Sequence, residues 1–577
     1  MPVKDEHEFR PRPGRIRDRG AGPTRSFIGQ VKAAARRAGL PAGGIGGGGP
    51  ASRSVFGRGR AASLNALRRV GGGVRRVTVK ARVVRQGGGA PLKLHLQYLQ
   101  RDGVDRAGAP GRLFTPAEES ADARAFAERT AGDRHHFRFI VSPEDAAELD
   151  DLKAFTRDLM SQAERDLGTR LDWVAVDHWN TAHPHVHVLV RGVTDEGRDL
   201  VIARDYIGQG LRARASELMS MELGPRTDLE IRRGLGAEVE VDRPTRLDQA
   251  LARDAAARAG VIDLRRAPKG EGDEVRRLKI ARLAKLERLG LAEPAGRGRW
   301  RLSPETNTVL KALARRGDII ARVHRALGEQ SMQRGGETWR LDAEPGGPMV
   351  GRLVERGLDD ELKGSAFAIV DGVDGRLHHI TLPSLEAAGD AGAGAIVEVR
   401  RLHGKRGPMT TLAVRSDLSL DQQVTAEGAT WLDRRLVGGD RSSFAETGFG
   451  AAVREALGRR ADHLVTQGLA QRQGAAIRFV SGLLEKLRRR ELDGVATRLA
   501  AETGLPHRPV AEGEAVSGVV RRRLALASGR FAMIDDGLGF SLVPWRADLG
   551  QQLGRQVAGV MGPGGVLDLS RGRGLGR

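Results

Sequence analysis

The sequence of 577 residues contains no cysteine, only two tyrosines (Tyr98 and Tyr206) and few aromatic residues of any kind, 4% in total. Without cysteine, disulfide bonds, thiol catalysis and cysteine-bound zinc are excluded, which leaves histidine and carboxylate side chains as metal ligands. The sequence also lacks a secretory signal pattern and any apolar run long enough to span a bilayer. These absences predict a cytoplasmic protein with no membrane insertion.

Positive charge is what the sequence has in excess. Lysine and arginine outnumber aspartate and glutamate by 95 to 73, which gives a formal net charge of +22. This balance predicts a polyanionic partner, with nucleic acid favoured over an anionic membrane surface. The length exceeds that of one domain and predicts three or four.

Four of the fourteen histidines fall within the single stretch DWVAVDHWNTAHPHVHVLVRG. The pattern predicts a hairpin of two short strands, Asp172–His178 and His185–Arg191. His185 and His187 alternate with valines, so they point to one face, and pairing of the strands brings His178 towards them. Three neutral imidazoles that converge from a rigid sheet predict a divalent-metal site with open coordination positions. The alternative is a histidine-rich strand that faces solvent.

The surrounding sequence predicts an α+β or layered α/β domain with a central antiparallel sheet. Alternating valines predict a strand that starts near Val74, and HHFRFIVSP predicts another at His135–Pro143. Ser142 and Pro143 are expected to start a helix that runs to about Leu167. The other expected helices are 92–101, 116–128 and 204–223.

The first of these helices carries a group of polar residues around a rare tyrosine. Tyr98 lies three residues after His95 and three before Arg101, so the three side chains share a neighbourhood. Tyrosine can attack a phosphodiester as a covalent nucleophile, and a metal ion can hold the phosphate and neutralise developing charge. Because a phenol has a pKa of about 10, it needs the ion, a base or Arg101 to ionise near neutral pH.

The remaining segments predict further modules on either side of this domain, which we place at residues 74–227. Residues 1–73 are expected to be a disordered basic arm that contacts phosphates or is only a solvated tail. Residues 228–345 are expected to hold a linker and a winged-helix-like module. Its basic residues, which either contact DNA or belong to a three-helix packing module, are Arg276, Arg277, Lys279, Arg282 and Lys285.

An internal resemblance organises the C-terminal half. Val350–Gly372 matches Ser517–Gly537, which predicts two copies of a small β-barrel-like module, at residues 346–420 and 511–577. A helical segment at residues 421–510 is expected between them. The second copy ends in an arginine-rich tail, which serves either docking or solubility.

Two of these motifs together resemble those of HUH-type conjugative relaxases. The block H-x-N-x-x-H-P-H-x-H at His178–His187 is similar to the third relaxase motif, H-x-D-x-x-x-P-H-x-H. The block HLQYLQRDG at His95–Gly103 is similar to the first motif, which holds a tyrosine within Y-[LI]-x-R. The resemblance is to the P-type branch that includes the agrobacterial T-DNA border nickase, and it covers about residues 75–225. The C-terminal half resembles the uncharacterised domain that follows many such relaxases.

The resemblance implies roles for individual residues. Tyr98 is implied as the nucleophile, and Arg101 is expected to contact DNA phosphate. The implied ligands of a Mg²⁺ or Mn²⁺ ion are His178, His185 and His187. The acid of the family's third motif is Asn180 in this sequence, so His95, Asn180 and Asp177 are all candidates for orienting the metal site or for acting as the base.

The implied activity is site- and strand-specific nicking of single-stranded DNA at an origin of transfer, through a 5′-phosphotyrosine. The implied partners in the bacterial cytoplasm are relaxosome accessory proteins and a type IV secretion coupling protein, with translocation of the protein alongside the DNA. One alternative is a rolling-circle replication initiator or transposase of the HUH class, which is less favoured because no helicase phosphate loop follows and Tyr98 precedes the histidines. The other is a non-catalytic DNA-binding accessory protein with a structural ion.

Overall fold

The computed structural model describes residues 58–59, 73–85, 90–101, 104–181, 183–266, 272–328, 338–342, 347–404, 407–439, 444–474, 476–550, 552–563 and 566–569. The chain divides into two compact units, Met1–Glu240 with Arg266–Arg282, and Val241–Arg265 with Leu283–Arg577. Both mix helices with antiparallel sheets, as the predicted α+β class requires. None of the described helices combines the length and apolarity that crossing a bilayer requires.

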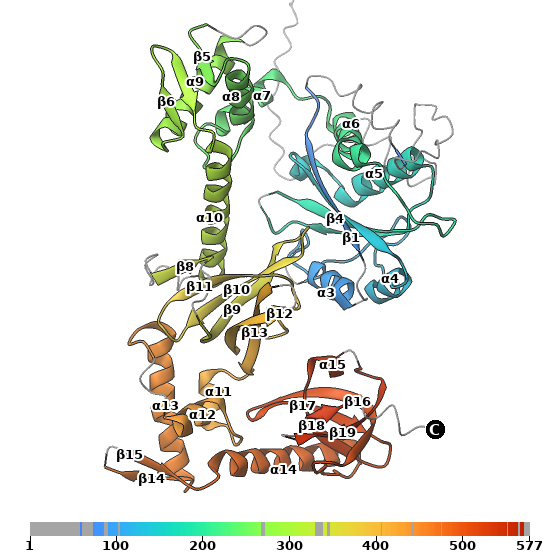
Figure 1. Cartoon of the computed structure of the whole chain (residues 1–577). Helices are drawn as coiled ribbons and strands as arrows, with labels where there is room; N and C mark the ends of the chain where they lie inside the picture. The colour runs from blue at the N-terminus through green and yellow to red at the C-terminus, as the bar shows by residue number, and fades with distance from the viewer. Residues whose placement is uncertain are drawn as a thin grey trace, which may run out of the picture. The chain divides into compact units, whose positions relative to one another are not determined.

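The first unit is built on a four-stranded antiparallel sheet of order β1-β2-β4-β3 (Figure 1). Its strands are β1 (Val77–Arg85), β2 (His135–Pro143), β3 (Trp173–His178) and β4 (His185–Arg191). The predicted hairpin is confirmed, because β3 and β4 pair with His178 opposite His185. The sheet therefore brings the histidines to the end of one strand and the start of the next.

One face of this sheet is closed by an apolar core. Alternate residues of all four strands pack there with α5 (Leu152–Leu167) and α6 (Leu211–Leu223). The expected start of α5 is wrong, because Pro143 pairs with Val77 and so belongs to the end of β2. A short 3-10 turn, η1 (Ala146–Glu148), follows, and Asp151 caps α5 instead.

The opposite face is covered over β3 and β4 by α3 (Ala90–Leu99) and α4 (Ala123–Thr130). Three leucines of α3, Leu92, Leu96 and Leu99, pack against apolar residues of β3 and β4. α4 begins later than predicted. The Thr115 hydroxyl accepts hydrogen bonds from the backbone N–H groups of Ala117 and Glu118, and Asp122 is the N-cap of a helix that starts at Ala123.

The remainder of the first unit follows β4 in the chain. The predicted helix 204–223 begins with a π-helical turn, η2 (Tyr206–Gly210), before α6, and α7 (Asp228–Ala237) comes next. Most of the predicted basic arm, residues 1–73, lies outside the described residues. Arg58 is described, and it bridges to Ile202 in parallel while its guanidinium donates to the Leu167 carbonyl.

A small module comes next, in which a helix is followed by a hairpin. Its helices are α8 (Arg246–Ala256), α9 (Asp273–Arg288) and α10 (Thr306–Leu327), and its strands are β5 (Val261–Asp263), β6 (Ala292–Pro294) and β7 (Arg299–Leu302). The division between the two units falls within α9, because Arg266–Arg282 belong to the first unit and the chain from Leu283 belongs to the second. β7 pairs with both β6 and β5. The predicted order of α9 and then a hairpin is therefore present.

The basic face predicted on α9 is engaged within the protein. Lys279 and Arg282 are fully buried, and Arg282 donates to the Val239 carbonyl. Lys285 pairs with Asp242 at 2.9 Å. These contacts favour the packing alternative over DNA contact for this helix.

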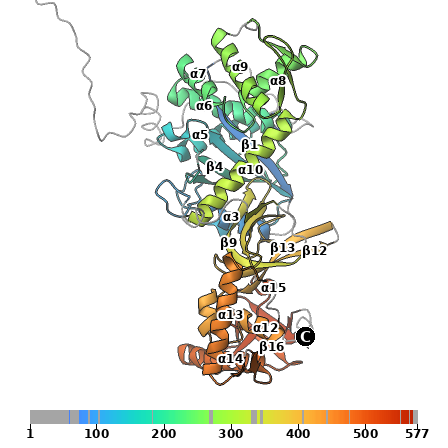
Figure 2. The same ribbon diagram turned by 90° about the vertical axis from the view of Figure 1, so that its left-hand side faces the viewer.

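A six-stranded sheet, of which five strands are antiparallel, follows the first module. It contains β9 (Met349–Asp360), β10 (Ser365–Gly372), β11 (Leu377–Leu382), β12 (Ile396–Gly404) and β13 (Gly407–Ser416), with β8 (Trp339–Leu341) parallel to β11 at the edge. Figure 2 shows this sheet from the side, with β12 and β13 running out beyond the other strands.

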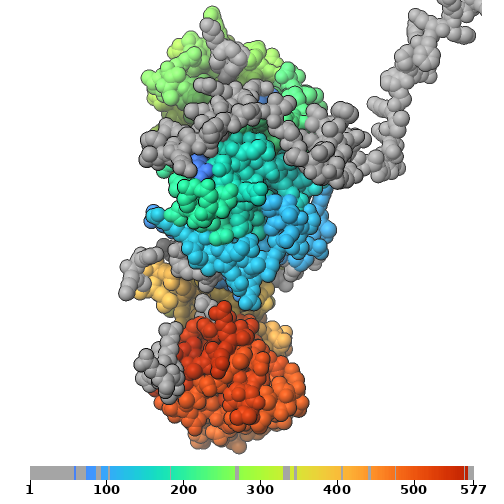
Figure 3. Space-filling model, turned by 90° about the vertical axis from the view of Figure 1, so that its right-hand side faces the viewer, coloured from blue at the N-terminus to red at the C-terminus, as the bar shows by residue number. Residues whose placement is uncertain are grey.

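The same arrangement then recurs. Its elements are α11 (Leu420–Thr425), α12 (Trp431–Gly438), α13 (Gly448–Thr466), β14 (Ala470–Gln473), β15 (Ala476–Phe479), α14 (Leu483–Thr503), β16 (Ala515–Leu526), β17 (Gly529–Asp535), β18 (Phe540–Pro544), α15 (Ala547–Gly550), β19 (Gln556–Met561) and β20 (Leu567–Asp568). Figure 3 shows the orange and red surface that this second copy presents.

The two copies correspond strand by strand. The sheet orders are β13-β12-β9-β10-β11 and β20-β19-β16-β17-β18. The likeness extends to the preceding helices, since Gly290 and Gly468 both have φ of 70°, and Leu291 and Leu469 each donate back into the helix before them. The predicted repeat is therefore confirmed, and it is larger than the matched sequences, because it includes the helix, the hairpin and the long helix before each sheet.

The description of the two sheets as barrel-like is wrong for the described residues, because neither strand order closes on itself. In each copy, a further segment pairs in parallel with the strand at one edge of the sheet. In the first copy β8 pairs with β11, and in the second His507 bridges to Phe540 at the start of β18. The long helices α10 and α14 pack on the outer face of the second strand, through Ile319 and Val323 in one copy and Val495 and Leu499 in the other.

Equivalent glycines in the two sheets provide a test of the repeat. A Cβ on Gly351 would clash with the Asp371 carbonyl, and one on Gly518 would clash with the Asp535 carbonyl. We expect Gly351→Ala and Gly518→Ala each to lower the free energy of unfolding by about 1–3 kcal/mol, because the strand must shift to admit the methyl group. Thermal unfolding followed by circular dichroism measures the loss.

Gly317 in α10 is the matched control, because nothing lies within 4 Å of a Cβ built there. Gly317→Ala should raise the melting temperature, since alanine is favoured over glycine in a helix by up to ~1 kcal/mol. Wild-type melting of both sheet variants would contradict the close backbone approach.

Candidate metal centre

Three imidazoles converge where β3 ends and β4 begins. Candidate ligand nitrogens of His178, His185 and His187 lie within 4.8 Å of one another, with ring centroids 4.6 to 5.5 Å apart. His178 and His187 are buried, and His185 is partly exposed at the start of its strand. The structure thus brings together the three histidines that the sequence predicted as ligands.

Backbone carbonyls orient two of these rings. The Nε2 atom of His178 donates to the Leu99 carbonyl at 2.8 Å, and Nδ1 of His185 donates to the His183 carbonyl at 3.0 Å. A carbonyl oxygen only accepts, so in the neutral rings the lone pair lies on Nδ1 of His178 and on Nε2 of His185. Histidines that bind metals characteristically donate their other nitrogen in this way.

The distance between the Nε2 atoms of His185 and His187 fits one ion bound by both rings. The Nε2 atoms of His185 and His187 are 3.2 Å apart. Two nitrogens bound to one ion at about 2.1 Å, at tetrahedral or octahedral angles, are about 3.0–3.4 Å apart. The donor set therefore fits a divalent ion with further coordination positions for other ligands.

The predicted nucleophile is tied to this cluster through the end of α3. The carbonyl that His178 binds belongs to Leu99, the residue that follows Tyr98. The guanidinium of Arg101 lies 4.3 Å from the centroid of the Tyr98 ring and donates to the Tyr98 carbonyl. Tyr98 is partly exposed, whereas His95, one turn earlier, is buried. The two relaxase-like motifs are therefore joined by a direct hydrogen bond.

The other candidates for orienting groups lie differently. Asp177 precedes His178 in β3, so its side chain points to the opposite face of the sheet, where it accepts from Trp179 Nε1 at 2.7 Å and lies 3.9 Å from Lys153. Asn180 is exposed in the connection between the strands. The structure does not bring Asp177 to the face that carries the imidazoles.

The second tyrosine has a structural role. Tyr206 is 2% exposed, and its hydroxyl donates to Asp166 at 2.9 Å, a carboxylate that Arg214 also binds through two nitrogens. Burial, followed by the Asp166 charge, raises the Tyr206 pKa well above its ordinary value. Of the two tyrosines, Tyr98 is therefore the one with a partly exposed side chain.

A cationic strip on the same face of the sheet as His187 was missed by the sequence reasoning. It consists of Lys80 and Arg82 on β1 and Arg138 on β2, as the cross-strand register shows. Lys80 and Arg82 are exposed. The signal was the same alternation that predicted the strand, since Lys80 and Arg82 are two residues apart and so share one face.

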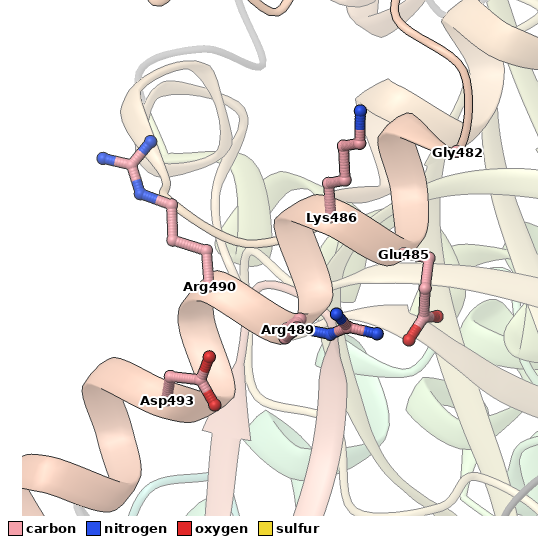
Figure 4. A pocket seen from close by; sticks show the side chains of 6 residues that line it. All are labelled: Gly482, Glu485, Lys486, Arg489, Arg490 and Asp493. Carbon is pink, nitrogen blue, oxygen red and sulfur yellow. The ribbon is translucent and has the colours of Figure 1, made fainter.

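The second unit carries a shallow pocket along one face of α14 (Figure 4). Its lining residues are Gly482, Glu485, Lys486, Arg489, Arg490 and Asp493. All of them come from one helix and its start, and basic and acidic groups are mixed, so the pocket presents no catalytic arrangement comparable to the imidazole cluster.

Metal binding can be tested one histidine at a time. We expect His187→Ala to weaken Mn²⁺ binding to the full chain by at least ~100-fold, because one of three ligands is lost. Isothermal titration calorimetry with the metal alone measures the change.

His183→Ala is the matched control. His183 contributes its backbone carbonyl to His185, so removal of its exposed ring should leave Mn²⁺ affinity within about twofold. An equal loss in both variants would contradict the assignment of ligands.

His136 makes stability depend on pH. Burial, followed by the charge of Arg138, lowers its pKa to about 3, whereas an unfolded histidine has a pKa near 6.5. Between these values the unfolded state binds the extra proton, so stability falls as pH decreases below about 6.5, by about 2 kcal/mol at pH 5. Urea unfolding at pH 5 and 7 measures this.

Replacement by an uncharged residue should flatten that dependence. We expect His136→Asn to lose less stability between pH 7 and pH 5 than the wild type, while the exposed His183→Asn follows the wild type. A wild-type slope in His136→Asn would assign the acid sensitivity to other groups.

Comparison with known proteins bears on the second unit. The profile of a family described as "Protein of unknown function (DUF3363)" matches residues 279–411 and 403–576. The matched residues include both large sheets of the repeat and together span more than half of the chain, and they exclude the imidazole cluster. Searches of curated proteins and of solved structures found no match. On the strength of the family match, the chain belongs to the DUF3363 family.

Proposed function

We propose that the chain is a metal-dependent DNA-nicking transesterase, a relaxase of the HUH type. In this proposal it cleaves one strand at an origin of transfer and pilots that strand in conjugative transfer, with relaxosome accessory proteins and a type IV secretion coupling protein as partners. The observation that carries the proposal is the hydrogen bond from His178 to the Leu99 carbonyl. It places a three-imidazole cluster beside the residue that follows the partly exposed Tyr98.

The histidines supply the site for a divalent ion. Held by His178, His185 and His187, the ion would polarise a non-bridging oxygen of the scissile phosphate and neutralise charge that develops there. Three imidazoles favour a transition ion such as Mn²⁺ over Mg²⁺, because Mg²⁺ prefers oxygen ligands.

The protein's own side chains perform the transfer. The phenolic oxygen of Tyr98 attacks the phosphorus, and a bond from Tyr98 to the phosphate forms as the bond to the 3′ oxygen breaks. The phenol proton leaves to a base, for which His95 on the same helix is the candidate, and the departing 3′ oxygen takes up a proton. One phosphodiester is exchanged for another, so attack by a 3′-hydroxyl on the adduct rejoins the strand.

Arg101 and the cationic strip support binding of the strand. The Arg101 guanidinium lies over the Tyr98 ring, where its charge would bind the phosphate that Tyr98 attacks. Lys80 and Arg82 extend positive charge across the same face of the sheet. With aromatic residues at only 4% of the chain, phosphate contacts rather than base stacking are expected to dominate affinity.

Covalent capture of DNA tests the proposal. Full-length protein is incubated with Mn²⁺ and a pool of single-stranded oligonucleotides and is then denatured with detergent. Protein that still has DNA attached is isolated, and the attached DNA is sequenced. We expect an adduct for the wild type and a loss of about 10³-fold or more for Tyr98→Phe, because the attacking oxygen is removed.

Tyr206→Phe is the matched control, because it removes the same atom from the other tyrosine. It should keep the adduct and lower the free energy of unfolding by about 1–3 kcal/mol through loss of the bond to Asp166. An adduct that persists in Tyr98→Phe would exclude Tyr98 as the nucleophile. No adduct with any oligonucleotide, despite metal binding, would favour the accessory DNA-binding protein with a structural ion.

A further inference from the structure

The hairpin of β12 and β13 extends beyond its sheet as a two-stranded ribbon. Within the described part of the chain, β12 pairs with β9 from Ile396 to Val399. From Arg400 to Gly404 it pairs with β13, up to the pair of Gly404 with Gly407. Figure 2 shows the two strands projecting from the side of the sheet. Five residues at about 3.3 Å each give a reach of about 16 Å.

The outer part of this ribbon exposes apolar side chains. Leu402 is 48% exposed and Met409 is 43% exposed, and the two residues are opposite each other in the ladder. Pro408, opposite His403, is also exposed. Exposed apolar residues that gather on a projecting β-ribbon indicate a binding surface, since such a ribbon otherwise invites aggregation.

The ribbon is also strongly basic. Residues 396–416 include five lysines and arginines and one acidic residue, Glu398. Glu398 lies at the base of the ribbon, where Arg400 and Arg415 bind it. Arg401 is exposed beside Leu402. A partner that matches this surface has negative charge outside and an apolar interior, which describes the phosphates and stacked bases of duplex DNA.

The second copy of the repeat shows that the fold does not require the extension. The equivalent hairpin consists of β19 with six residues and β20 with two, against nine and ten in β12 and β13. Residues 556–568 contain no lysine or arginine. Both copies build the same arrangement of five antiparallel strands. The length, charge and exposed apolar end of the first ribbon are therefore not needed for the fold, and they indicate a role in binding.

We propose that the β12–β13 ribbon is a duplex-DNA-binding arm. Its reach exceeds the depth of either DNA groove, about 8 Å, and β-ribbons bind DNA in the major or the minor groove. Arg401 contacts the phosphate backbone, while Leu402, Pro408 and Met409 press against base steps and bend the duplex, as apolar side chains do in architectural DNA-binding proteins. This activity is separate from cleavage of a single strand and does not depend on Tyr98.

The test measures duplex binding and bending by the full chain. A 30-base-pair duplex (about three helical turns) carries a fluorophore at each end, so that anisotropy reports binding and energy transfer reports bending. We expect Arg401→Ala/Leu402→Ser/Met409→Ser to raise the Kd about tenfold and to abolish the bend. Arg401→Ala alone should reduce the slope of log K against log salt by about 0.9, the value for one phosphate contact.

The second copy provides the matched control. Arg555→Ala/Leu553→Ser removes one exposed arginine and one exposed leucine beside the equivalent hairpin, and it should bind and bend the duplex like the wild type. Thermal unfolding of each variant shows whether its fold is retained.

Two results would overturn the proposal. One is a folded ribbon variant that binds and bends the duplex normally, or that loses no more than the control. The other is a ribbon variant with wild-type DNA binding and an altered oligomeric state, which would assign the surface to a protein partner. Covalent capture of single strands is run on the same variants, so failure of the nicking proposal is read separately from failure of the arm.

Discussion

The hydrogen bond between His178 and the Leu99 carbonyl is the contact on which the arrangement of the candidate site depends. At the helix end, it satisfies one of the last carbonyls of α3, which has no partner within the helix. In the sheet, it selects the tautomer that turns the lone pair of His178 away from α3. One contact thus fixes both the His178 ring, a candidate ligand, and the helix that carries Tyr98, and neither can move without disturbing the other.

The sheet keeps this contact in place because its two faces serve different purposes. One face buries alternate apolar residues against α5 and α6, which makes the strand register costly to change, since a slip by one residue would turn every side chain to the wrong face. The other face is covered over β3 and β4 by α3 and α4. It also carries the imidazoles and, on β1 and β2, cationic side chains.

The alternation of apolar and polar residues along single strands made the hairpin and the shared direction of its histidines predictable from sequence. Val186, Val188 and Val190 indicated both the strand and the shared direction of His185 and His187. The same rule argues against Asp177, which adjoins His178 and therefore faces away, although it was a candidate. Tertiary contacts were beyond sequence reasoning: the register of β1 with β2 drew Pro143 into a strand, and burial of Lys279 and Arg282 removed a face that looked suited to DNA.

The duplicated half of the chain has a consequence for how such a protein can change over time. The two copies of the scaffold are tied together by contacts such as the ion pairs of Arg530 with Asp390 and Asp417. Within that shared framework, the hairpin at the edge of one sheet can lengthen or change its charge while the other stays short. The unequal hairpins of the two sheets show that the scaffold tolerates this variation.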